Sequence, residues 1–270
     1  MRFLILILDA IVPCSRRRIL PRAGRLSLGA VAAPALLVVA AGGALAAETA
    51  GPPASLPRTQ RLVAAGQPVR IILYGDSISE VKKGWSGGAR SPKANWGPRL
   101  VARLAAAHPA CRFTLQHFAV GGENTRDGLA RLGGLAALEP DLVLVAFGAN
   151  DCCHRFLAPA ETAAALTELV TGICRLGADV VVVGTGGDNP RQPFFRHLDE
   201  TLAAQRAVAA REGVPFVDIR AAVLAATGDG RRWAEFHIDA GNCHPTDAGH
   251  DAWAAAASAA IEAAWSRPGP

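Results

Sequence analysis

Beyond its first 46 residues the chain has no surplus of either charge, although its formal net charge is +5. Of 28 basic and 23 acidic residues, six arginines and one aspartate lie in residues 1–46, so the other 22 basic and 22 acidic side chains cancel. A neutral body without a basic block does not suit a phosphate backbone, which argues against nucleic acid as a partner. The 270 residues, half of them hydrophobic, are enough for one large domain with a buried core.

Other features that the sequence lacks exclude further classes of function. The stretch "GTGGDN" (184–189) does not complete the G-x-G-x-x-G dinucleotide fingerprint, and we expect no cofactor and no bound metal. No internal repeat is present, and the only compositional bias lies in alanine-rich segments that favour helices. No long apolar insertion suggests a lid for a lipid substrate.

The N-terminal segment has the features of an export signal. Basic "SRRRILPRAGR" (15–25) precedes the uncharged stretch 26–46, which ends in the small-x-small cleavage pattern Ala44-Leu45-Ala46. The segment from Ser15 resembles the twin-arginine signal, and a transmembrane anchor is the competing interpretation. We expect residues 1–46 to be removed on export to the periplasm or medium, leaving no stable membrane partner. A linker over 47–67 and a catalytic domain over 68–266 then follow.

Beyond this linker, strand-like and helix-like segments alternate. Apolar, β-branched runs predict five strands, at 69–74, 112–118, 141–147, 179–184 and 214–219. Amphipathic or alanine-rich stretches predict helices, at 96–107, 125–138, 159–176, 195–213 and 246–265. Such alternation predicts a three-layer α/β/α sandwich around a mostly parallel five-stranded sheet.

Polar and glycine-rich segments follow the predicted strands. They are "GDS" (75–77), "AVGGENT" (119–125), "GAND" (148–151) and "GTGGDN", and "HIDAGNCHPTDAGH" (237–250) precedes the last helix. In a doubly wound sheet, chemistry is found outside the carboxyl ends of the strands. We therefore expect a serine, a glycine-rich turn, an asparagine and a histidine to converge on one edge.

The chain resembles the GDSL or SGNH hydrolases over roughly residues 69–265. Four blocks stand in the family's order: Gly-Asp-Ser at 75–77, a glycine in "GGENT" (121–125), G-x-N-D at 148–151 and His-Pro at 244–245. The resemblance implies a flavodoxin-like sheet and hydrolysis of an ester or related acyl bond. It also implies Ser77 as nucleophile, His244 as base, and an oxyanion hole formed by the N–H groups of Ser77 and Gly122 and the amide of Asn150.

These residue types suit that chemistry. A serine hydroxyl becomes nucleophilic when an adjacent imidazole takes its proton. Gly122 permits close backbone approach and Asn150 offers two N–H donors on a short side chain. Singly, each block is also compatible with an ordinary turn or helix start. We expect His117 and His250 to be structural or exposed.

A second serine lies in a misleading motif. "GWSGG" (84–88) matches the G-x-S-x-G nucleophile elbow, but that elbow must lie between a strand and a helix. Neither flank of Ser86 fits this context, so we do not expect it to be the nucleophile.

The residue that orients His244 departs from the family pattern. The family places an aspartate three residues before the histidine, where this chain has Gly241. Asp239 is the predicted orienting residue, since a looped backbone can absorb two extra residues. Asn242 and a backbone carbonyl are the alternatives.

The cysteines leave several possibilities open. An odd number, Cys111, Cys152, Cys153, Cys174 and Cys243, follows the predicted signal, so at least one thiol is free. Export would favour a bridge from Cys243 to Cys152 or Cys153, and buried free thiols are the alternative. A zinc site that also uses His154 lacks the usual ligand spacing.

The predicted activity is that of a serine esterase that works through an acyl-enzyme. The polar, cationic loop 78–95 and the flat faces of Trp85, Trp96 and Phe194-Phe195 favour short acyl groups on a carbohydrate, such as acetyl. An acyltransferase, a lipase or lysophospholipase, and an inactive carbohydrate-binding protein are the alternatives.

Overall fold

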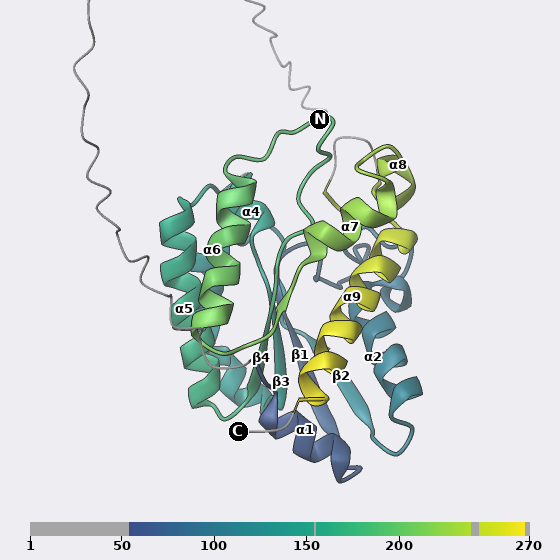
Figure 1. The fold of residues 1–270 in the computed structure, drawn as a ribbon, viewed down its shortest axis with the longest axis vertical. Helices are drawn as coiled ribbons and strands as arrows, with labels where there is room; N and C mark the ends of the chain where they lie inside the picture. The colour runs from purple at the N-terminus through teal and green to yellow at the C-terminus, as the bar shows by residue number, and fades with distance from the viewer. Residues whose placement is uncertain (1–53, 154, 239–242, 268–270) are drawn as a thin grey trace, which may run out of the picture. The chain divides into compact units, whose positions relative to one another are not determined.

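The computed structural model describes residues 54–153, 155–238 and 243–267 (Figure 1). Five parallel strands form one sheet in the order β2-β1-β3-β4-β5. They are β1 (Val69–Gly75), β2 (Phe113–His117), β3 (Leu142–Ala146), β4 (Asp179–Val183) and β5 (Phe216–Val217). This is the flavodoxin-like strand order, so the predicted fold class is confirmed.

Helices connect these strands. The longer ones are α1 (Pro57–Ala64), α2 (Trp96–Ala107), α5 (Pro159–Arg175), α6 (Leu198–Arg211), α7 (Ile219–Thr227) and α9 (Asp247–Trp265). The shorter ones are α3 (Thr125–Arg131), α4 (Ala149–Cys152), α8 (Trp233–Phe236) and the 3₁₀ segments η1 (Pro92–Ala94) and η2 (Leu132–Leu138). Among the described residues, no helix is long and apolar enough to cross a membrane.

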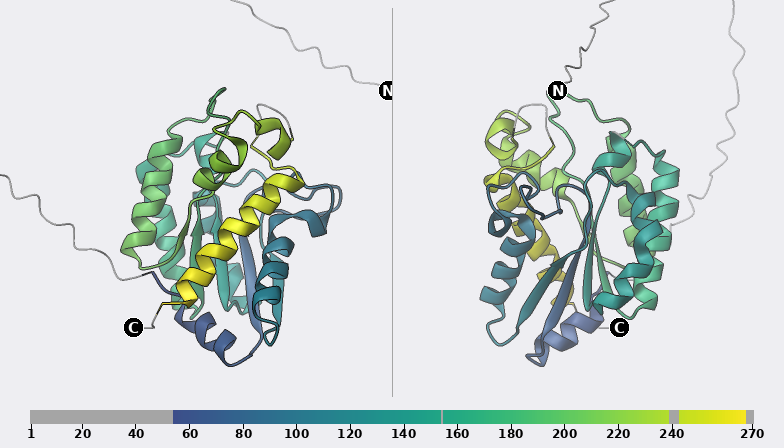
Figure 2. Two further views of the ribbon diagram at one scale, coloured as in Figure 1. Left: turned by 45° about the vertical axis from the view of Figure 1, so that its right-hand side comes forward. Right: turned by 180° about the vertical axis from the view of Figure 1, so that it is seen from behind.

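The helices cover both faces of the sheet (Figure 2). Ile71 and Leu73 of β1 pack into a core that includes α2 and α9. Ile72 and Tyr74, which point the other way because side chains alternate along a strand, pack into a core that includes α5 and α6. Strands β3 and β4 are buried on both faces, which explains their almost wholly apolar sequences.

Two predicted elements differ in extent. The helix expected over 125–138 is α-helical only to Arg131 and continues as the 3₁₀ segment η2, which contains the poor helix formers Gly133 and Gly134. A Cβ atom on Gly134 would lie 2.9 Å from the ring of Phe118, so this glycine allows close packing. The strand expected over 214–219 is ladder-paired only at Phe216–Val217.

The predicted linker, 47–67, also differs from the structure, because α1 lies within it. The backbone N–H and hydroxyl of Thr59 both donate to Asp179 Oδ2, each at 2.7 Å. Arg58 Nη2 lies 2.6 Å from Asp141 Oδ1. These acceptors lie at the starts of β3 and β4, so α1 caps the edge of the sheet opposite the carboxyl ends of the strands.

Candidate active site

The register of the sheet brings the ends of β1 and β3 to the same level. Gly75 pairs with Ala146, and the N–H of Val120 donates to the carbonyl of Gly75 at 3.0 Å. The segments that begin at Asp76, Val120 and Gly148 therefore leave the sheet along one edge, as the sequence predicts.

The turn at Gly75–Ser77 is tightly packed. A Cβ atom on Gly75 would lie 2.5 Å from the carbonyl oxygen of Ala146, so a larger residue cannot replace this glycine without a shift of the strands. The buried carboxyl of Asp76 accepts a hydrogen bond from the N–H of Ile78 at 3.0 Å. Burial raises the pKa of Asp76 to about 7. The result is a compact turn that presents Ser77 at the edge of the sheet.

Ser77 and His244 meet although 167 positions separate them in sequence. The Oγ atom of Ser77 lies 2.8 Å from Nε2 of His244. Trp85 supports both partners: its indole N–H donates to the carbonyl of Ser77 at 2.8 Å, and its ring lies edge-on to the His244 ring at 5.1 Å. Trp85, predicted only as a flat face for substrate, therefore also braces the nucleophile and the imidazole.

The glycines of "GWSGG" permit close packing rather than form a nucleophile elbow. Gly88 has a φ of +100°, and a Cβ atom there would lie 2.5 Å from the carbonyl oxygen of Pro245 and 3.2 Å from His244 Cβ. Ser86 is buried and lines a different hollow from Ser77. The motif lets loop 84–88 lie directly against the histidine segment.

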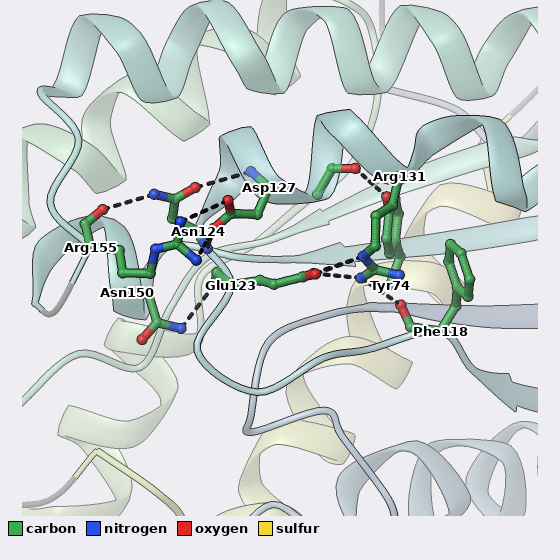
Figure 3. A network of polar contacts seen from close by, with 9 residues as sticks. Tyr74, Phe118, Glu123, Asn124, Asp127, Arg131, Asn150 and Arg155 are labelled. Carbon is green, nitrogen blue, oxygen red and sulfur yellow. Dashed lines mark hydrogen bonds and ion pairs between the residues drawn. The ribbon is translucent and has the colours of Figure 1, made fainter.

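Gly122 and Asn150, the proposed oxyanion donors, line the same cavity as Ser77. Gly122 has a φ of +84°, lines the cavity over Ser77, and leaves open space at its Cβ position, where an added atom would meet nothing within 4 Å beyond its chain neighbours. Asn150, in the first turn of α4, is buried and donates one amide hydrogen to the carbonyl of Glu123 at 2.9 Å (Figure 3). The second amide hydrogen is left for a ligand in the cavity, which Asn150 also lines.

The fully buried Asp151 ties the asparagine segment to the glycine loop. Its Oδ2 accepts the backbone N–H of Thr125 at 3.0 Å, and its Oδ1 accepts the hydroxyl of Thr162 at 2.9 Å. Burial raises the pKa of Asp151. Asp151 belongs to the G-x-N-D motif, but its sequence position predicts no contact, because both partners come from other segments.

A cavity of about 680 Å³ opens over Ser77. It is lined by Ser77, Glu80, Lys82, Trp85, Gly121, Gly122, Ala149, Asn150, Cys153, Phe194, Phe195, Cys243 and His244. The predicted site residues Ser77, Gly122, Asn150 and His244 are thus brought together. Phe194 and Phe195 also lie here, as expected, and the Asp188 carboxylate accepts both of their backbone N–H groups.

Trp96 corrects one prediction. It is fully buried at the start of α2 and packs against Trp253, with ring centroids 5.8 Å apart, so it offers no face to a substrate. An indole at the start of an amphipathic helix has no sequence signal that separates a core position from an exposed one. Only the packing of α2 against α9 decides this.

Glu80 and Lys82 were not predicted individually. Lys82 Nζ lies 2.8 Å from Glu80 Oε2, and Glu80 is nearly buried at the edge of the cavity. A Cβ atom on Gly121 would lie 2.9 Å from that same carboxylate oxygen and 3.5 Å from Ser77 Cβ. The carboxylate therefore lies beside the nucleophile.

Three of the other described histidines have structural contacts. The N–H of Trp96 donates to Nδ1 of the buried His250 at 3.2 Å, which makes Nε2 the protonated nitrogen that donates to the carbonyl of Gly87 at 3.1 Å. His237 stacks on Trp233 at 3.7 Å. Burial lowers the pKa of both His237 and His250 to about 4. Burial also lowers the pKa of His117, which contacts the carbonyl of Ser79.

Asp239, Gly241 and Asn242 lie outside the described residues, so the orienting residue of His244 stays a prediction. The cysteines that the structure describes are free thiols, which does not support the bridge considered for Cys243. Burial raises the pKa of Cys152 and of Cys243 to about 12. No group of three or more potential metal ligands occurs within the described ranges, and His154, one candidate ligand, lies outside them.

Comparison with known proteins gives one family and a set of similar structures. Residues 73–252 match the model of the GDSL-like lipase/acylhydrolase family. No curated protein sequence matches the chain. An α/β hydrolase enzyme named LAE5, from the metagenome of Lake Arreo in Spain, is 26% identical with a TM-score of 0.61, covering 73% of this chain and 96% of its own.

Two further similar structures have carbohydrate substrates in their descriptions. The acetylxylan esterase Axe2 of Geobacillus stearothermophilus is 23% identical with a TM-score of 0.60, covering 74% of this chain and 96% of its own. A two-domain esterase active on acetylated mannans, crystallised with mannopentaose, is 20% identical with a TM-score of 0.64. It covers 81% of this chain and 56% of its own, and at these identities both likenesses concern the fold.

Proposed function

Because the chain belongs to the GDSL-like lipase/acylhydrolase family, whose members hydrolyse esters, we propose that it removes short acyl groups, acetyl first, from carbohydrate esters. The observation that carries the proposal is the 2.8 Å approach of Ser77 Oγ to His244 Nε2 in a cavity that Gly122 and Asn150 also line. A hydroxyl, an adjacent base and convergent N–H donors are the requirements of acyl transfer through a serine.

The reaction follows from this geometry. His244 Nε2 takes the hydroxyl proton of Ser77 as Oγ bonds to the ester carbonyl carbon. The carbonyl oxygen becomes an oxyanion, which accepts hydrogen bonds from the N–H groups of Ser77 and Gly122 and from the free amide hydrogen of Asn150. His244 then gives its proton to the departing alcohol. Water, deprotonated by the same imidazole, then attacks the acyl carbon; the bond to Oγ breaks, His244 returns the proton to Oγ, and the carboxylic acid leaves.

The charged pair of Lys82 and Glu80 supports a short acyl group. Glu80 lies beside Ser77 and is paired with Lys82, so a long alkyl chain on this side would cover a charged pair instead of apolar surface. Glu80 is already buried, but the Lys82 side chain is 59% exposed, so covering it would remove its charge from water without new hydrogen bonds, which disfavours long chains. An acetyl group reaches the nucleophile without covering the pair.

The other residues that line the cavity support a carbohydrate as the alcohol part of the ester. Trp85, Phe194 and Phe195 line the cavity as flat apolar faces, next to the polar Glu80 and Lys82. Sugar rings present both C–H faces and hydroxyls, so this combination suits them. The acetylxylan and acetylmannan esterases among the similar structures support the same substrate class.

The test is a panel of p-nitrophenyl esters from acetyl to palmitoyl, together with acetylated xylo- and mannooligosaccharides. We expect kcat/KM to fall steadily beyond short acyl groups and the oligosaccharides to release acetate. Intact-mass analysis after treatment with a fluorophosphonate should show one adduct, which peptide mapping places on Ser77. A preference for long chains would refute the acyl assignment, and neither turnover nor labelling would refute the esterase proposal.

We also propose that the chain is exported with loss of residues 1–46, on the sequence features alone. N-terminal sequencing of protein secreted by an expressing cell should then begin near Ala47. An intact N-terminus in the membrane fraction would favour the anchor.

A further inference from the structure

Glu123, whose carbonyl accepts the amide hydrogen of Asn150, has a side chain that forms a charged pair with Arg131 (Figure 3). The guanidinium of Arg131, at the end of α3, contacts the Glu123 carboxylate through two nitrogens. Nε lies 2.8 and 3.0 Å from the two carboxylate oxygens, and Nη2 lies 2.5 Å from Oε2. The Glu123 side chain is 13% exposed and that of Arg131 is 26% exposed, so solvent screens this pair less than a surface pair.

The guanidinium itself is held by residues of β1 and of the segment after β2. Its Cζ atom lies 5.2 Å from the centre of the Tyr74 ring and 4.6 Å from that of Phe118. Nη2 also donates to the carbonyl of Phe118 at 3.4 Å, and the Tyr74 hydroxyl donates to the carbonyl of Gly128 on α3. Arg131 thus links Glu123 to β1 and to the segment after β2.

Glu123 is held at one end by Arg131 and contacts the oxyanion hole at the other. Its carbonyl accepts the amide hydrogen of Asn150, and it directly follows Gly122. Gly122 has a left-handed φ, and beyond its chain neighbours no atom lies within 4 Å of its Cβ position. Its restraint comes from the two ends of the loop: the N–H of Val120 donates to the carbonyl of Gly75 in β1, and the side chain of Glu123 is held by Arg131.

We propose that the Arg131–Glu123 pair is a positioning device that aims the N–H of Gly122 and the amide of Asn150 at the developing oxyanion. An oxyanion hole accelerates the reaction because its donors are oriented before charge appears. A planar guanidinium in a two-nitrogen contact fixes a carboxylate more rigidly than an ammonium does. The inference rests on the proposed function, because it assumes an oxyanion formed at Ser77.

The test compares Arg131→Ala and Arg131→Lys with a matched control, Arg206→Ala. Arg206 also contacts a carboxylate, Asp218, at 2.5 Å and lies over the Phe216 ring at 5.2 Å, but it does not line the catalytic cavity. With p-nitrophenyl acetate, Arg131→Ala should lower kcat by about 10- to 100-fold with KM unchanged. Misaligned N–H donors stabilise the oxyanion of the transition state less well, whereas binding of the ground-state ester depends little on them. Arg131→Lys should fall between wild type and alanine, and Arg206→Ala should match wild type.

A second readout separates positioning from stability. A trifluoromethyl ketone forms a tetrahedral adduct with the serine and places an oxyanion in the hole. In Arg131→Ala its inhibition constant should therefore rise by about the same factor by which kcat falls. Millimolar guanidinium ion should restore part of the activity of Arg131→Ala and none to Asn150→Ala. If Arg131→Ala does not fold, Glu123→Gln takes its place in the test. This variant keeps the shape of the side chain and should show the same selective loss of kcat.

Three results would overturn the inference. They are an unchanged kcat in folded Arg131→Ala and Glu123→Gln, an increase confined to KM, and an equal loss in Arg206→Ala. Failure of the proposed function is a different result: the wild-type protein would then neither turn over esters nor be labelled at Ser77.

Discussion

The two sides of the catalytic cavity are held together by different forces. The oxyanion side, residues 120–131, 149–153 and 155, is fixed by charged and polar contacts such as Glu123–Arg131 and Asp151 with Thr125. The base side, residues 84–88, 233–238 and 243–250, is fixed by rings and glycines, including the Trp233–His237 stack and the packing of Gly88 against Pro245.

This difference matches what each side contributes. Backbone and amide donors must point at one position in space, and charged hydrogen bonds restrain direction strongly. The imidazole of His244 has to approach the hydroxyl closely, and the edge-on ring of Trp85 together with the close backbone approach at Gly88 provides that. The two sides should therefore respond differently to substitution and to pH.

The serine between the two sides should give the largest effect. Ser77→Ala should remain folded and lose about four to six orders of magnitude in kcat, because nucleophile and base act as one unit. Ser86→Ala should keep nearly full activity, since Ser86 lines a different hollow. Steady-state kinetics of the two variants on p-nitrophenyl acetate decide this, and the reverse ranking would remove Ser77 as nucleophile.

On the oxyanion side, Asn150→Ala should lower kcat by about 100- to 1,000-fold, the typical cost of one lost donor. The KM for p-nitrophenyl acetate should change little, because the amide acts mainly on the transition state. Thermal melting checks that α4 stays folded. A kcat within a few-fold of wild type would mean that Asn150 only holds the Glu123 carbonyl.

Asp239→Asn, at the predicted orienting residue of His244, should lower kcat by about a hundredfold or more, because a neutral amide stabilises the imidazolium less well. Asn242→Ala is the comparison variant and should cost much less. Near-normal activity in folded Asp239→Asn would indicate a serine–histidine dyad or another orienting residue.

The glycine contact at His244 should give a smaller effect. Gly88→Ala combines a φ of +100° with a Cβ atom 2.5 Å from the Pro245 carbonyl oxygen, and should cost about 1–3 kcal/mol of unfolding free energy. Activity should fall several-fold as the segment carrying His244 shifts. Gly84→Ala is the matched control, because it has a φ of +79° and no neighbour within 4 Å. Urea denaturation should show the larger loss for Gly88→Ala, and equal losses would contradict the contact.

Mild acid should give the smallest effect. It should lower the stability contributed by two buried histidines and raise the stability contributed by a buried carboxyl group. His237 and His250 have pKa values near 4 in the folded protein and 6.5 ordinarily, so the stability they contribute is complete above pH 6.5 and is lost as the pH falls toward 4. The pKa of Asp76 is raised from 3.8 to about 7, so its contribution is complete below pH 3.8 and is lost as the pH rises through 7.

Asp76→Asn removes only the second contribution. Its urea midpoint should therefore decline more steeply than that of wild type between pH 6.5 and pH 4. Asp199→Asn, at an exposed position, should follow wild type. Identical slopes for all three proteins would show that Asp76 is ionised in the folded state.

The sequence by itself determined the fold class and the residues that gather at the active site. Buried parallel strands require apolar runs such as those of β3 and β4, and the alternation with helices permits few topologies. Ser77, Asn150 and Gly122 follow directly after strands, so knowing the strands is enough to place them on one edge.

Only the tertiary structure decided what supports those residues. The contacts of Trp85 with Ser77 and His244, and of Arg131 with Glu123 over Tyr74, join segments whose side chains carry no local signal of a partner. Trp96 is part of the core for the same reason, although its sequence position allowed an exposed face. Periodicity along a chain reports which face of an element is buried, whereas pairwise contacts depend on the packing of elements that are distant in sequence.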